Sequence, residues 1–388
     1  MYNLIMRNTL RKQNAITLVA LIITIIVLLI LAMVSISLVM NGGIIDKSKS
    51  AVDKYSQEEI QEQIKLAYSE WQMGQYTGET RTAAEFMQAK LNSIYGTGAV
   101  TDVTETNGTF EVTFANGKGY SYNVSTGTVA KVVKWNDNGN NTFTHSETGQ
   151  TVEVGDTVYY NSGVAAYEGE GASQGKWGIL GVENGKLLIM SKENVASVTL
   201  EGKQGYLNGS TLLNNACSSF KNPTYADSVR SVKVEDINKI TGYTPAEPVT
   251  YTYTMVGGKV KRNDQTSASK KTKLEDINGK TLPTDSPIEV TANSYSYSLT
   301  NYLTSGNKVH NLLKDNNNYY WLDSPYVYAD AGGAVWGFRR VSDGGVYSDY
   351  LWSSIDGALS DSFGVRAVVS LKSDIQLSGS SSEGWTIQ

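Results

Sequence analysis

The most pronounced pattern in the chain is a hydrophobic segment near the N-terminus. Residues 16–40 contain no charged side chain, and Arg7, Arg11 and Lys12 precede them. At 1.5 Å per residue, a helix of about 25 residues crosses a hydrocarbon layer of roughly 30 Å. The pattern predicts a membrane-spanning helix with its basic flank in the cytoplasm, so that everything after Asn41 lies outside the cytoplasm.

The hydrophobic segment is followed by an amphipathic pattern. Beyond Gly42 and Gly43, apolar residues recur at helical spacing up to Trp71, while the residues between them include Glu58, Glu59, Glu62 and Lys65. This spacing predicts that one long helix covers residues 16–75, first hydrophobic and then amphipathic. The two glycines cost about 1 kcal/mol each inside a helix, so we expect the helix to bend where they lie.

The next block predicts a small α+β head over residues 76–133. A helix is expected over residues 80–95, with Thr82 as its N-cap and Glu85 completing a capping box. Residues 108–132 then alternate between apolar and polar side chains around two turns, at Asn116-Gly117 and at residues 125–127. That alternation is typical of an antiparallel meander.

A second domain is expected from Val152 onwards, after a polar linker at 134–151 that lacks apolar periodicity. All six prolines lie in the second half of the chain, which is typical of a looped fold. Two strands are predicted around an Asn184-Gly185 turn, at 177–182 and 186–191. Two short helices are predicted further on, with Ser210 and Ser231 as possible N-caps and Gly242 as the stop of the second.

The segment before the C-terminus contains two similar pieces, residues 336–341 and 363–368. Each has an aromatic residue, a glycine and then an arginine that alternates with apolar residues, as expected of strands with one face on a core. Two interpretations of Arg339 and Arg366 stay open. They are either paired or solvent-facing strand arginines, or direct ligand contacts.

Between Pro325 and Phe363, large aromatic residues are interleaved with Ser, Asp and Gly. This composition is typical of binding loops, because tyrosine and tryptophan rings lose little entropy on binding and small polar residues adapt their hydrogen bonds. The aromatic candidates for ligand binding are Tyr326, Tyr328, Trp336, Tyr347, Tyr350 and Trp352. The alternative is a turn-rich β structure with ordinary surface tyrosines.

Composition limits the chemistry that the chain can perform. The net charge is -5 and basic residues are scattered, so we expect no nucleic acid partner. Cys217 is the only cysteine, which excludes an intrachain disulfide and a thiolate metal cluster, and we expect it to be a buried structural thiol. We expect no metal, no cofactor and no catalytic residue. A carbohydrate-active enzyme remains the remote alternative, with a carboxylate pair drawn from Asp323, Asp343, Asp349, Asp356 and Asp361.

The N-terminal residues "AITLVAL", 15–21, followed by the hydrophobic segment, resemble the start of type IV pilins and pseudopilins. The resemblance implies cleavage by a prepilin peptidase between Ala15 and Ile16, methylation of Ile16, and assembly into a filament through a segment that includes Thr17, Leu18 and Ala20. Glycine is usual where Ala15 stands, and glutamate is usual where Ala20 stands. Because an unpaired charge in an apolar bundle is costly, a subunit without this glutamate is expected at a filament tip.

The motif "YWLDSP", 320–325, and the terminal "GVRAVVSL", 364–371, resemble a bacterial domain with a C-type-lectin-like fold. Related domains are varied by diversity-generating retroelements, which change surface residues on a constant scaffold. The resemblance implies that the variable ligand contacts of this chain are Tyr326, Tyr328, Asp330, Tyr347, Asp349, Tyr350, Trp352, Ser353 and Asp356.

Together these observations predict an α+β protein with a long transmembrane or assembly helix, a pilin-like head and a C-type-lectin-like domain. The expected parts are a basic leader (1–15), the long helix (16–75), the head (76–133), a linker (134–151), the binding domain (152–377) and a tail (378–388). The expected function is a minor or tip filament subunit that displays a ligand-binding domain for adhesion. Its expected partners are other pilin subunits, the prepilin peptidase, the membrane, and an extracellular protein or glycan.

The expected location is the cell membrane, spanned once, with the C-terminal part extracellular on the cell surface or a pilus. The main alternative is a single-pass, membrane-anchored surface binding protein that does not assemble. In that case the hydrophobic segment is a simple anchor, and ligand binding by the distal domain is the whole function.

Overall fold

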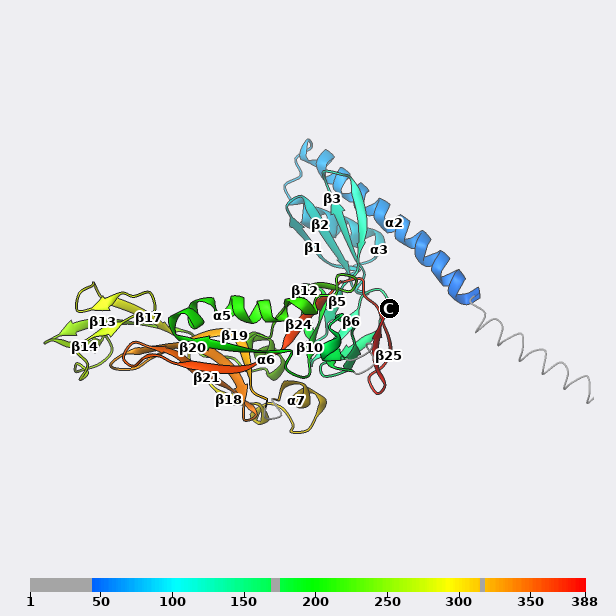
Figure 1. The fold of residues 1–388 in the computed structure, drawn as a ribbon. Helices are drawn as coiled ribbons and strands as arrows, with labels where there is room; N and C mark the ends of the chain where they lie inside the picture. Colours follow the sequence, from blue (N-terminus) through cyan, green and yellow to red (C-terminus); the bar gives the residue numbers. More distant parts are fainter. Residues whose placement is uncertain (1–43, 169–174, 315–317) are drawn as a thin grey trace, which may run out of the picture. The chain divides into compact units, whose positions relative to one another are not determined.

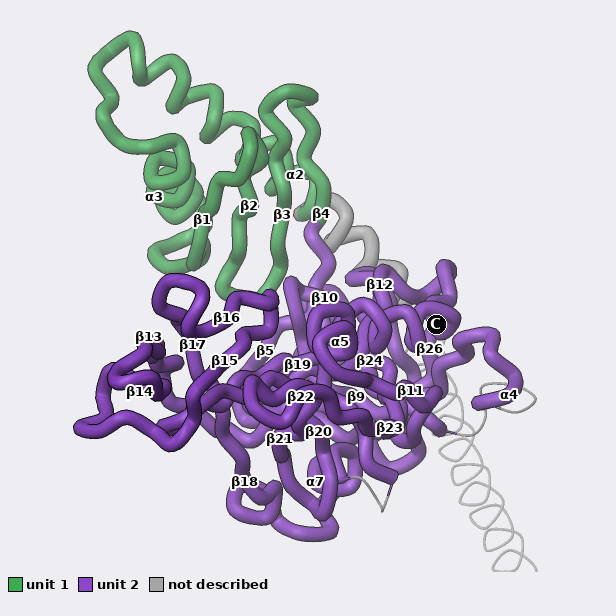
Figure 2. Tube along the Cα trace, turned by 60° about the vertical axis from the view of Figure 1, so that its left-hand side comes forward, with its two compact units in different colours: residues 1–131 green, residues 132–388 purple. Residues whose placement is uncertain are grey.

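The computed structural model describes residues 44–168, 175–314 and 318–388. They form two compact units, with the boundary between Lys131 and Val132 (Figure 2). The described chain is mostly β-sheet. This corrects the expected α+β class, because much of the second half, rich in Tyr, Thr and Val, forms strands.

No helix among the described residues is long and apolar enough to cross a membrane. The longest of them, α2 (Ile44–Gln75), has acidic and basic residues along its length, among them Glu58 and Lys65. Such charges are costly to bury in hydrocarbon. The predicted membrane-spanning helix, and with it the single-pass location at the cell membrane and surface, is therefore wrong for the described chain. Residues 16–40 themselves lie outside it.

The first unit packs two helices on a meander. Helix α2 is followed by α3 (Ala83–Tyr95) and by four strands that pair in chain order, β1 (Val100–Thr106), β2 (Thr109–Phe114), β3 (Gly119–Asn123) and β4 (Thr128–Val132). The predicted capping box is confirmed, because Thr82 Oγ1 accepts from the Glu85 amide and Glu85 accepts from the Thr82 amide. Helix and sheet residues share one core, including Ile64, Met87, Leu91, Phe110 and Val112.

The second unit contains two seven-stranded sheets. The first has the order β12-β24-β10-β9-β8-β26-β25. Its strands are β8 (Thr157–Tyr159), β9 (Trp177–Glu183), β10 (Lys186–Ser191), β12 (Ala226–Ser231), β24 (Ala367–Leu371), β25 (Leu377–Ser380) and β26 (Gly384–Ile387). The predicted β9–β10 hairpin is confirmed, with left-handed Asn184 and Gly185 at its turn.

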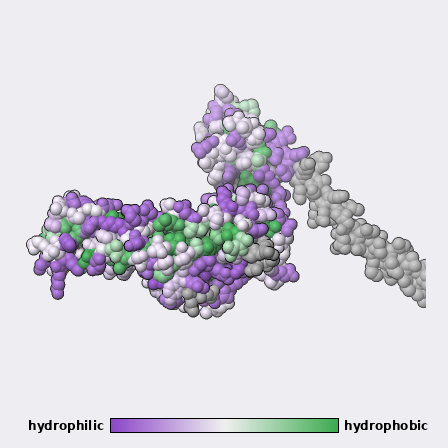
Figure 3. Space-filling view, in the orientation of Figure 1, coloured by the Kyte–Doolittle hydropathy of each residue, from purple (hydrophilic) through white to green (hydrophobic). Residues whose placement is uncertain are grey.

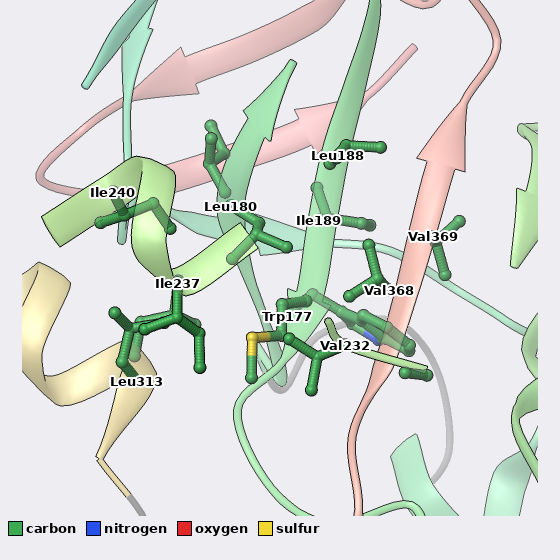
Figure 4. Close-up of a cluster of buried hydrophobic side chains, with 14 of the residues drawn as sticks. Trp177, Leu180, Leu188, Ile189, Val232, Ile237, Ile240, Leu313, Val368 and Val369 are labelled. Atoms are coloured by element: carbon green, nitrogen blue, oxygen red, sulfur yellow. The ribbon is translucent and has the colours of Figure 1, made fainter. Parts of the chain in front are cut away.

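Side chains of this sheet pack against two short helices, α6 (Val234–Thr241) and α7 (Lys308–Leu313). Figure 4 shows Ile237 and Ile240 of α6 and Leu313 of α7 in one buried cluster with Leu188, Ile189, Val368 and Val369 of the strands. Gly242 ends α6 in the left-handed conformation, as predicted. Ser231 is not its N-cap, because α6 begins three residues later, after Lys233.

The second sheet holds the predicted binding residues. Its order is β11-β23-β19-β20-β21-β18, with β22 paired to β21. Its strands are β11 (Ala196–Glu201), β18 (Tyr297–Ser298), β19 (Tyr320–Ala329), β20 (Ala334–Ser342), β21 (Gly345–Ser353), β22 (Gly357–Ala358) and β23 (Ser360–Val365).

Helix α5 (Gly202–Cys217) lies along this sheet (Figure 1). The close approach depends on Gly209, since a Cβ there would lie 2.5 Å from the Phe338 ring. Ser210 lies inside α5, so its predicted role as an N-cap is wrong. Hydrophobic residues gather over α5 on the molecular surface (Figure 3), where Leu207 and Leu212 are exposed.

The rest of the second unit consists of short elements. The expected linker forms a small sheet instead, because Trp135 and Phe143 bury their side chains. Its strands are β5 (Trp135–Asp137), β6 (Thr142–His145) and β7 (Thr151–Glu153). The remaining elements are β13 (Val249–Val256), β14 (Lys259–Arg262), β15 (Leu274–Glu275), β16 (Thr281–Leu282), β17 (Ile288–Ala292), α4 (Ala165–Glu168), η2 (Ser218–Phe220) and η3 (Leu299–Asn301).

Candidate functional site

Strands β19, β20 and β21 bring two of the predicted tyrosines to one face. Tyr326 pairs with Gly337, and Gly337 pairs with Tyr350. Directly paired residues point to the same face of a sheet, so both rings lie on the same side with the glycine between them. A Cβ at Gly337 would lie 2.6 Å from Tyr326 Cε1. The glycine therefore leaves room for the Tyr326 ring to lie across β20.

These rings belong to a pocket of about 370 Å³, which we call the tyrosine pocket. Four of the predicted residues line it, namely Tyr326, Tyr328, Tyr347 and Tyr350, which come from β19 and β21. The other lining residues are Ser294, Tyr295, Ser296, Arg340, Ser342, Asp343 and Ser348. Tyr328 and Tyr350 are 42% and 46% exposed, whereas Tyr326 is only 1% exposed, so exposed rings stand beside a buried one.

Two buried hydroxyl groups of the tyrosine pocket have no hydrogen-bond partner among the described residues. They are the hydroxyl of Tyr326 and Oγ of Ser342. Burial raises the pKa of Tyr326, so the phenol keeps its proton and can donate. A buried polar group left unpaired costs roughly 1–3 kcal/mol. A polar ligand that reached these hydroxyls would recover part of that energy.

Arg339 lies beneath the aromatic residues. It is 3% exposed, and its guanidinium carbon is 4.1 Å from the centre of the Tyr295 ring and 5.9 Å from that of Tyr326. It donates to the carbonyl oxygens of Pro325 and Asn293. Burial lowers its pKa. Arg339 is thus neither solvent-facing nor paired with a carboxylate among the described residues.

Arg366 has the same pattern of contacts. It is 1% exposed, donates to the carbonyl oxygens of Leu312 and Lys314, and lies 4.2 Å from the centre of the Tyr320 ring. Arg339 and Arg366 are thus both buried, and both donate to main-chain carbonyl groups. The sequence did not indicate this arrangement.

Tyrosines outside the predicted segment extend the aromatic layer. Tyr243 stacks on Tyr297 with ring centres 4.2 Å apart, and Tyr295 and Tyr302 contact the same pair. The residues 294–299, "SYSYSL", alternate strictly between serine and an apolar or aromatic side chain. That alternation is the signal by which the sequence indicates a wall of the pocket at Tyr295, although we did not predict it.

Asp349 does not line the tyrosine pocket. It lies next to two charged residues, Arg340 and Asp361. Its Oδ2 lies 2.8 Å from Nε of Arg340. Burial nevertheless raises the pKa of Asp349 to about 6, and the neighbouring Asp361 also raises it, against the lowering effect of Arg340. Desolvation and a like charge thus outweigh the ion pair.

Three other predicted residues lie at a different pocket. Trp352, Ser353 and Asp356 line a pocket of about 510 Å³ together with Leu274 and Pro283, among others. Ser353 Oγ lies 3.2 Å from Asp356 Oδ2 and accepts from the Asp356 amide, so this pair builds a turn. The Trp352 ring faces a cation, with Lys203 Nζ 4.4 Å from its centre.

The last two predicted residues have structural contacts. Trp336 is buried in a small cluster with Tyr253 and Val327. Asp330 accepts from the amides of Gly332 and Gly333, both at 2.7 Å, and so closes the turn between β19 and β20. The processing and assembly residues Ala15, Ile16, Thr17, Leu18 and Ala20 lie outside the described residues.

Two kinds of reactive site were sought among the described residues: a nucleophilic thiol and a cluster of metal ligands. Cys217 is buried, and its burial raises the pKa of the thiol to about 12. Within residues 44–168, 175–314 and 318–388, no three His, Cys, Asp or Glu side chains are grouped so that they could hold a metal ion. The polar lining of the tyrosine pocket consists of tyrosine and serine hydroxyls together with Arg340 and Asp343.

Comparisons with protein family models, with curated proteins and with solved structures give no match. The two family resemblances of the sequence therefore stay predictions.

Proposed function

We propose that the protein is a recognition protein whose second unit binds a ligand in the tyrosine pocket. The observation that supports this most directly is that four predicted contact residues, from two strands separated by β20, line one pocket. Two buried hydroxyls of that pocket have no partner within the described part of the chain. Large rings anchor a ligand, and the surrounding serines supply adaptable hydrogen bonds.

The energetics of the pocket also support recognition. Tyr328 and Tyr350 already stand exposed on a rigid sheet, so a ligand that covers them removes apolar ring surface from water at a small cost in side-chain entropy. Tyr326 is buried between Gly337 and Arg339, so its ring has little freedom to change rotamer. A pre-organised pocket of this kind favours a defined ligand shape.

The binding proposal is tested by probing the full chain against arrays of surface proteins and of glycans. The triple variant Tyr328→Ala, Tyr347→Ala and Tyr350→Ala should lose the array binding of the wild-type chain by at least tenfold. Tyr76→Ala is the matched control, since Tyr76 is 93% exposed on the first unit and far from the pocket in sequence. Unchanged binding by the triple variant would contradict the proposal.

We further propose that this binding unit is carried by a pilin-like filament subunit, processed between Ala15 and Ile16. The proposal draws support from the order of elements in the first unit, a 32-residue helix followed by a short helix and a meander. Mass spectrometry of sheared filament material tests it. A methylated chain that starts at Ile16 is expected, and an intact Met1 in all fractions would refute it.

A further inference from the structure

Strand β21 is incompletely paired on one side. On its inner side it pairs with β20 along its length. On its outer side β18 pairs with residues 345–346 and β22 pairs with residues 352–353. Between them, no described strand pairs with residues 347–350, which we call the open edge of β21. An unpaired edge presents backbone N–H and C=O groups to which another strand can bond.

The hydrogen-bond pattern shows which residues of β21 direct their backbone groups outward. Leu299, which follows β18, donates from its amide to the Gly344 carbonyl, so Gly344 faces outward. The bonding direction alternates from residue to residue along an antiparallel strand. Val346, Ser348 and Tyr350 therefore face outward as well, since the bulge in the β20–β21 ladder comes only after Tyr350.

Three backbone groups of the open edge form no hydrogen bond with the described part of the chain. The Tyr350 amide donates to Oδ1 of Asp349 at 3.0 Å. The Ser348 amide, the Ser348 carbonyl and the Tyr350 carbonyl have no such partner on the outer side. An extended residue placed opposite Ser348 can bond to both of its groups, as in a hydrogen-bonded pair of an antiparallel ladder. The open edge therefore suits recognition by strand addition.

The open edge borders the tyrosine pocket. Ser348 and Tyr350 both line that pocket, and Tyr350 is 46% exposed. Directly opposed residues of two strands point to one face, and so do alternate residues of one strand. A peptide residue opposite Ser348 would therefore point to the face with the tyrosine rings, as would the residues two positions before and after it. One segment could thus use the backbone of the edge and the side chains of the pocket together.

The charges of the tyrosine pocket favour a basic side chain in such a segment. Its two charged lining residues are Arg340 and Asp343. The charge of Arg340 is already matched, because its Nε lies 2.8 Å from Oδ2 of Asp349. Asp343 is exposed and accepts from the Tyr319 hydroxyl at 2.6 Å, but no cation of the described chain forms an ion pair with it. A lysine or arginine of the ligand would supply that counter-charge, with the modest effect usual for exposed pairs.

We propose that the open edge of β21 binds an extended peptide segment. The segment adds a strand beside Ser348 and places alternate side chains, one of them lysine or arginine, in the tyrosine pocket. This rests on the proposed function and names the class of its ligand. Residues 347–350 leave room for about four peptide residues, roughly 13 Å of strand. Because β18 and β22 close the two ends, the site suits a short segment.

An array of linear heptapeptides, with lysine at the fourth position and random residues elsewhere, tests the class of ligand. The full chain should bind a subset of these peptides. The triple variant Tyr328→Ala, Tyr347→Ala and Tyr350→Ala should lose that binding at least tenfold. Binding only to glycans, or only to folded proteins, would overturn the peptide proposal and leave the proposed function intact. Absence of binding on every array would count against both.

Recognition of the backbone is tested with N-methylated copies of the strongest array peptide. A methyl group on an amide that bonds to the edge should weaken binding at least tenfold, and a methyl group on the next amide should have little effect, because successive amides point to opposite sides. The Ser348 amide, followed by NMR hydrogen exchange, should exchange at least tenfold more slowly with the peptide bound. Equal effects at all positions, or unchanged exchange at Ser348, would overturn strand addition.

Asp343→Asn tests the basic side chain. Asparagine readily adopts the left-handed conformation that Asp343 has, at φ 49°, so the turn is kept. The variant should bind the lysine peptide at least threefold more weakly, and should bind its norleucine analogue as the wild type does. Asp356→Asn is the matched control, because Asp356 lines the other pocket. Equal loss in both variants, or no loss for Asp343→Asn, would contradict the pairing.

Discussion

The rings of Tyr326 and Tyr350 lie 6.1 Å apart, centre to centre, on strands that do not pair with each other. The strand between them contributes Gly337 at the same register position. Because Gly337 has no side chain, β20 leaves room for the two rings to approach each other. Both rings line the tyrosine pocket.

Replacing Gly337 by alanine should destabilise the protein. The new Cβ would lie 2.6 Å from Tyr326 Cε1 and would also collide with the main-chain oxygen of Asp349. Overpacking of this kind costs typically 1–3 kcal/mol in the free energy of unfolding, to be measured by urea denaturation. Gly181→Ala is the control, since a Cβ at Gly181 of β9 meets nothing within 4 Å. Equal stability of both variants would argue against the close approach of the Tyr326 ring.

Removing the hydroxyl of Tyr326 should leave stability unchanged or raise it slightly. The hydroxyl is buried and none of the described residues pairs with it, so Tyr326→Phe removes an unpaired polar group whose desolvation costs about 1–3 kcal/mol. Tyr253→Phe should instead lower stability by about 1 kcal/mol, because the Tyr253 hydroxyl lies 2.6 and 2.7 Å from the carbonyl oxygens of Asp330 and Gly333. Thermal and urea unfolding of the two variants give the comparison, and a larger loss for Tyr326→Phe would contradict it.

Asp349 should make the protein less stable as the pH rises from about 4 to about 6. Its pKa is raised by burial from 3.8 to about 6, so in this interval the folded chain holds a proton that the unfolded chain has lost. The contribution to stability is complete below the unfolded pKa and is lost as the pH rises through the folded pKa. Over this interval the urea midpoint of the wild type should fall relative to that of Asp349→Asn, because the asparagine side chain does not titrate. Parallel pH profiles would show that Asp349 is ionised throughout.

Loss of the N-cap of α3 should destabilise the first unit. Thr82→Ala removes the side-chain acceptor of the Glu85 amide and half of the capping box. The expected cost is about 1 kcal/mol, measured by the urea dependence of helical circular dichroism. Thr80→Ala is a suitable control, since Thr80 is exposed two residues before the cap. Similar stability of the two variants would show that the cap contributes nothing.

Local patterns predicted the local elements well. The capping box at Thr82, the β9–β10 hairpin at Asn184-Gly185 and the stop at Gly242 follow from turn and cap chemistry within a few residues. The N-caps expected at Ser210 and Ser231 failed because packing decides where those helices begin. Helix α5 starts at Gly202, eight residues earlier, where its glycines allow close contact with the sheet.

The candidate site was predicted only in part, since composition does not reveal which face of a strand a residue occupies. Four tyrosines meet at the tyrosine pocket, whereas Trp352 and Asp356 line another pocket. The bulge in β19 between Trp321 and Pro325 was not predicted from the sequence.

The sequence by itself determined the capping box, the hairpin turns, the alternating strands and the concentration of tyrosine near the C-terminus, because these depend on neighbours a few residues apart. Only the tertiary structure decided the strand order and which tyrosines share a pocket. The physical reason is that strand pairing joins residues far apart in the chain. A shift of one residue in register reverses the face of every side chain. Burial of charges such as Arg339 and Asp349 follows from that pairing.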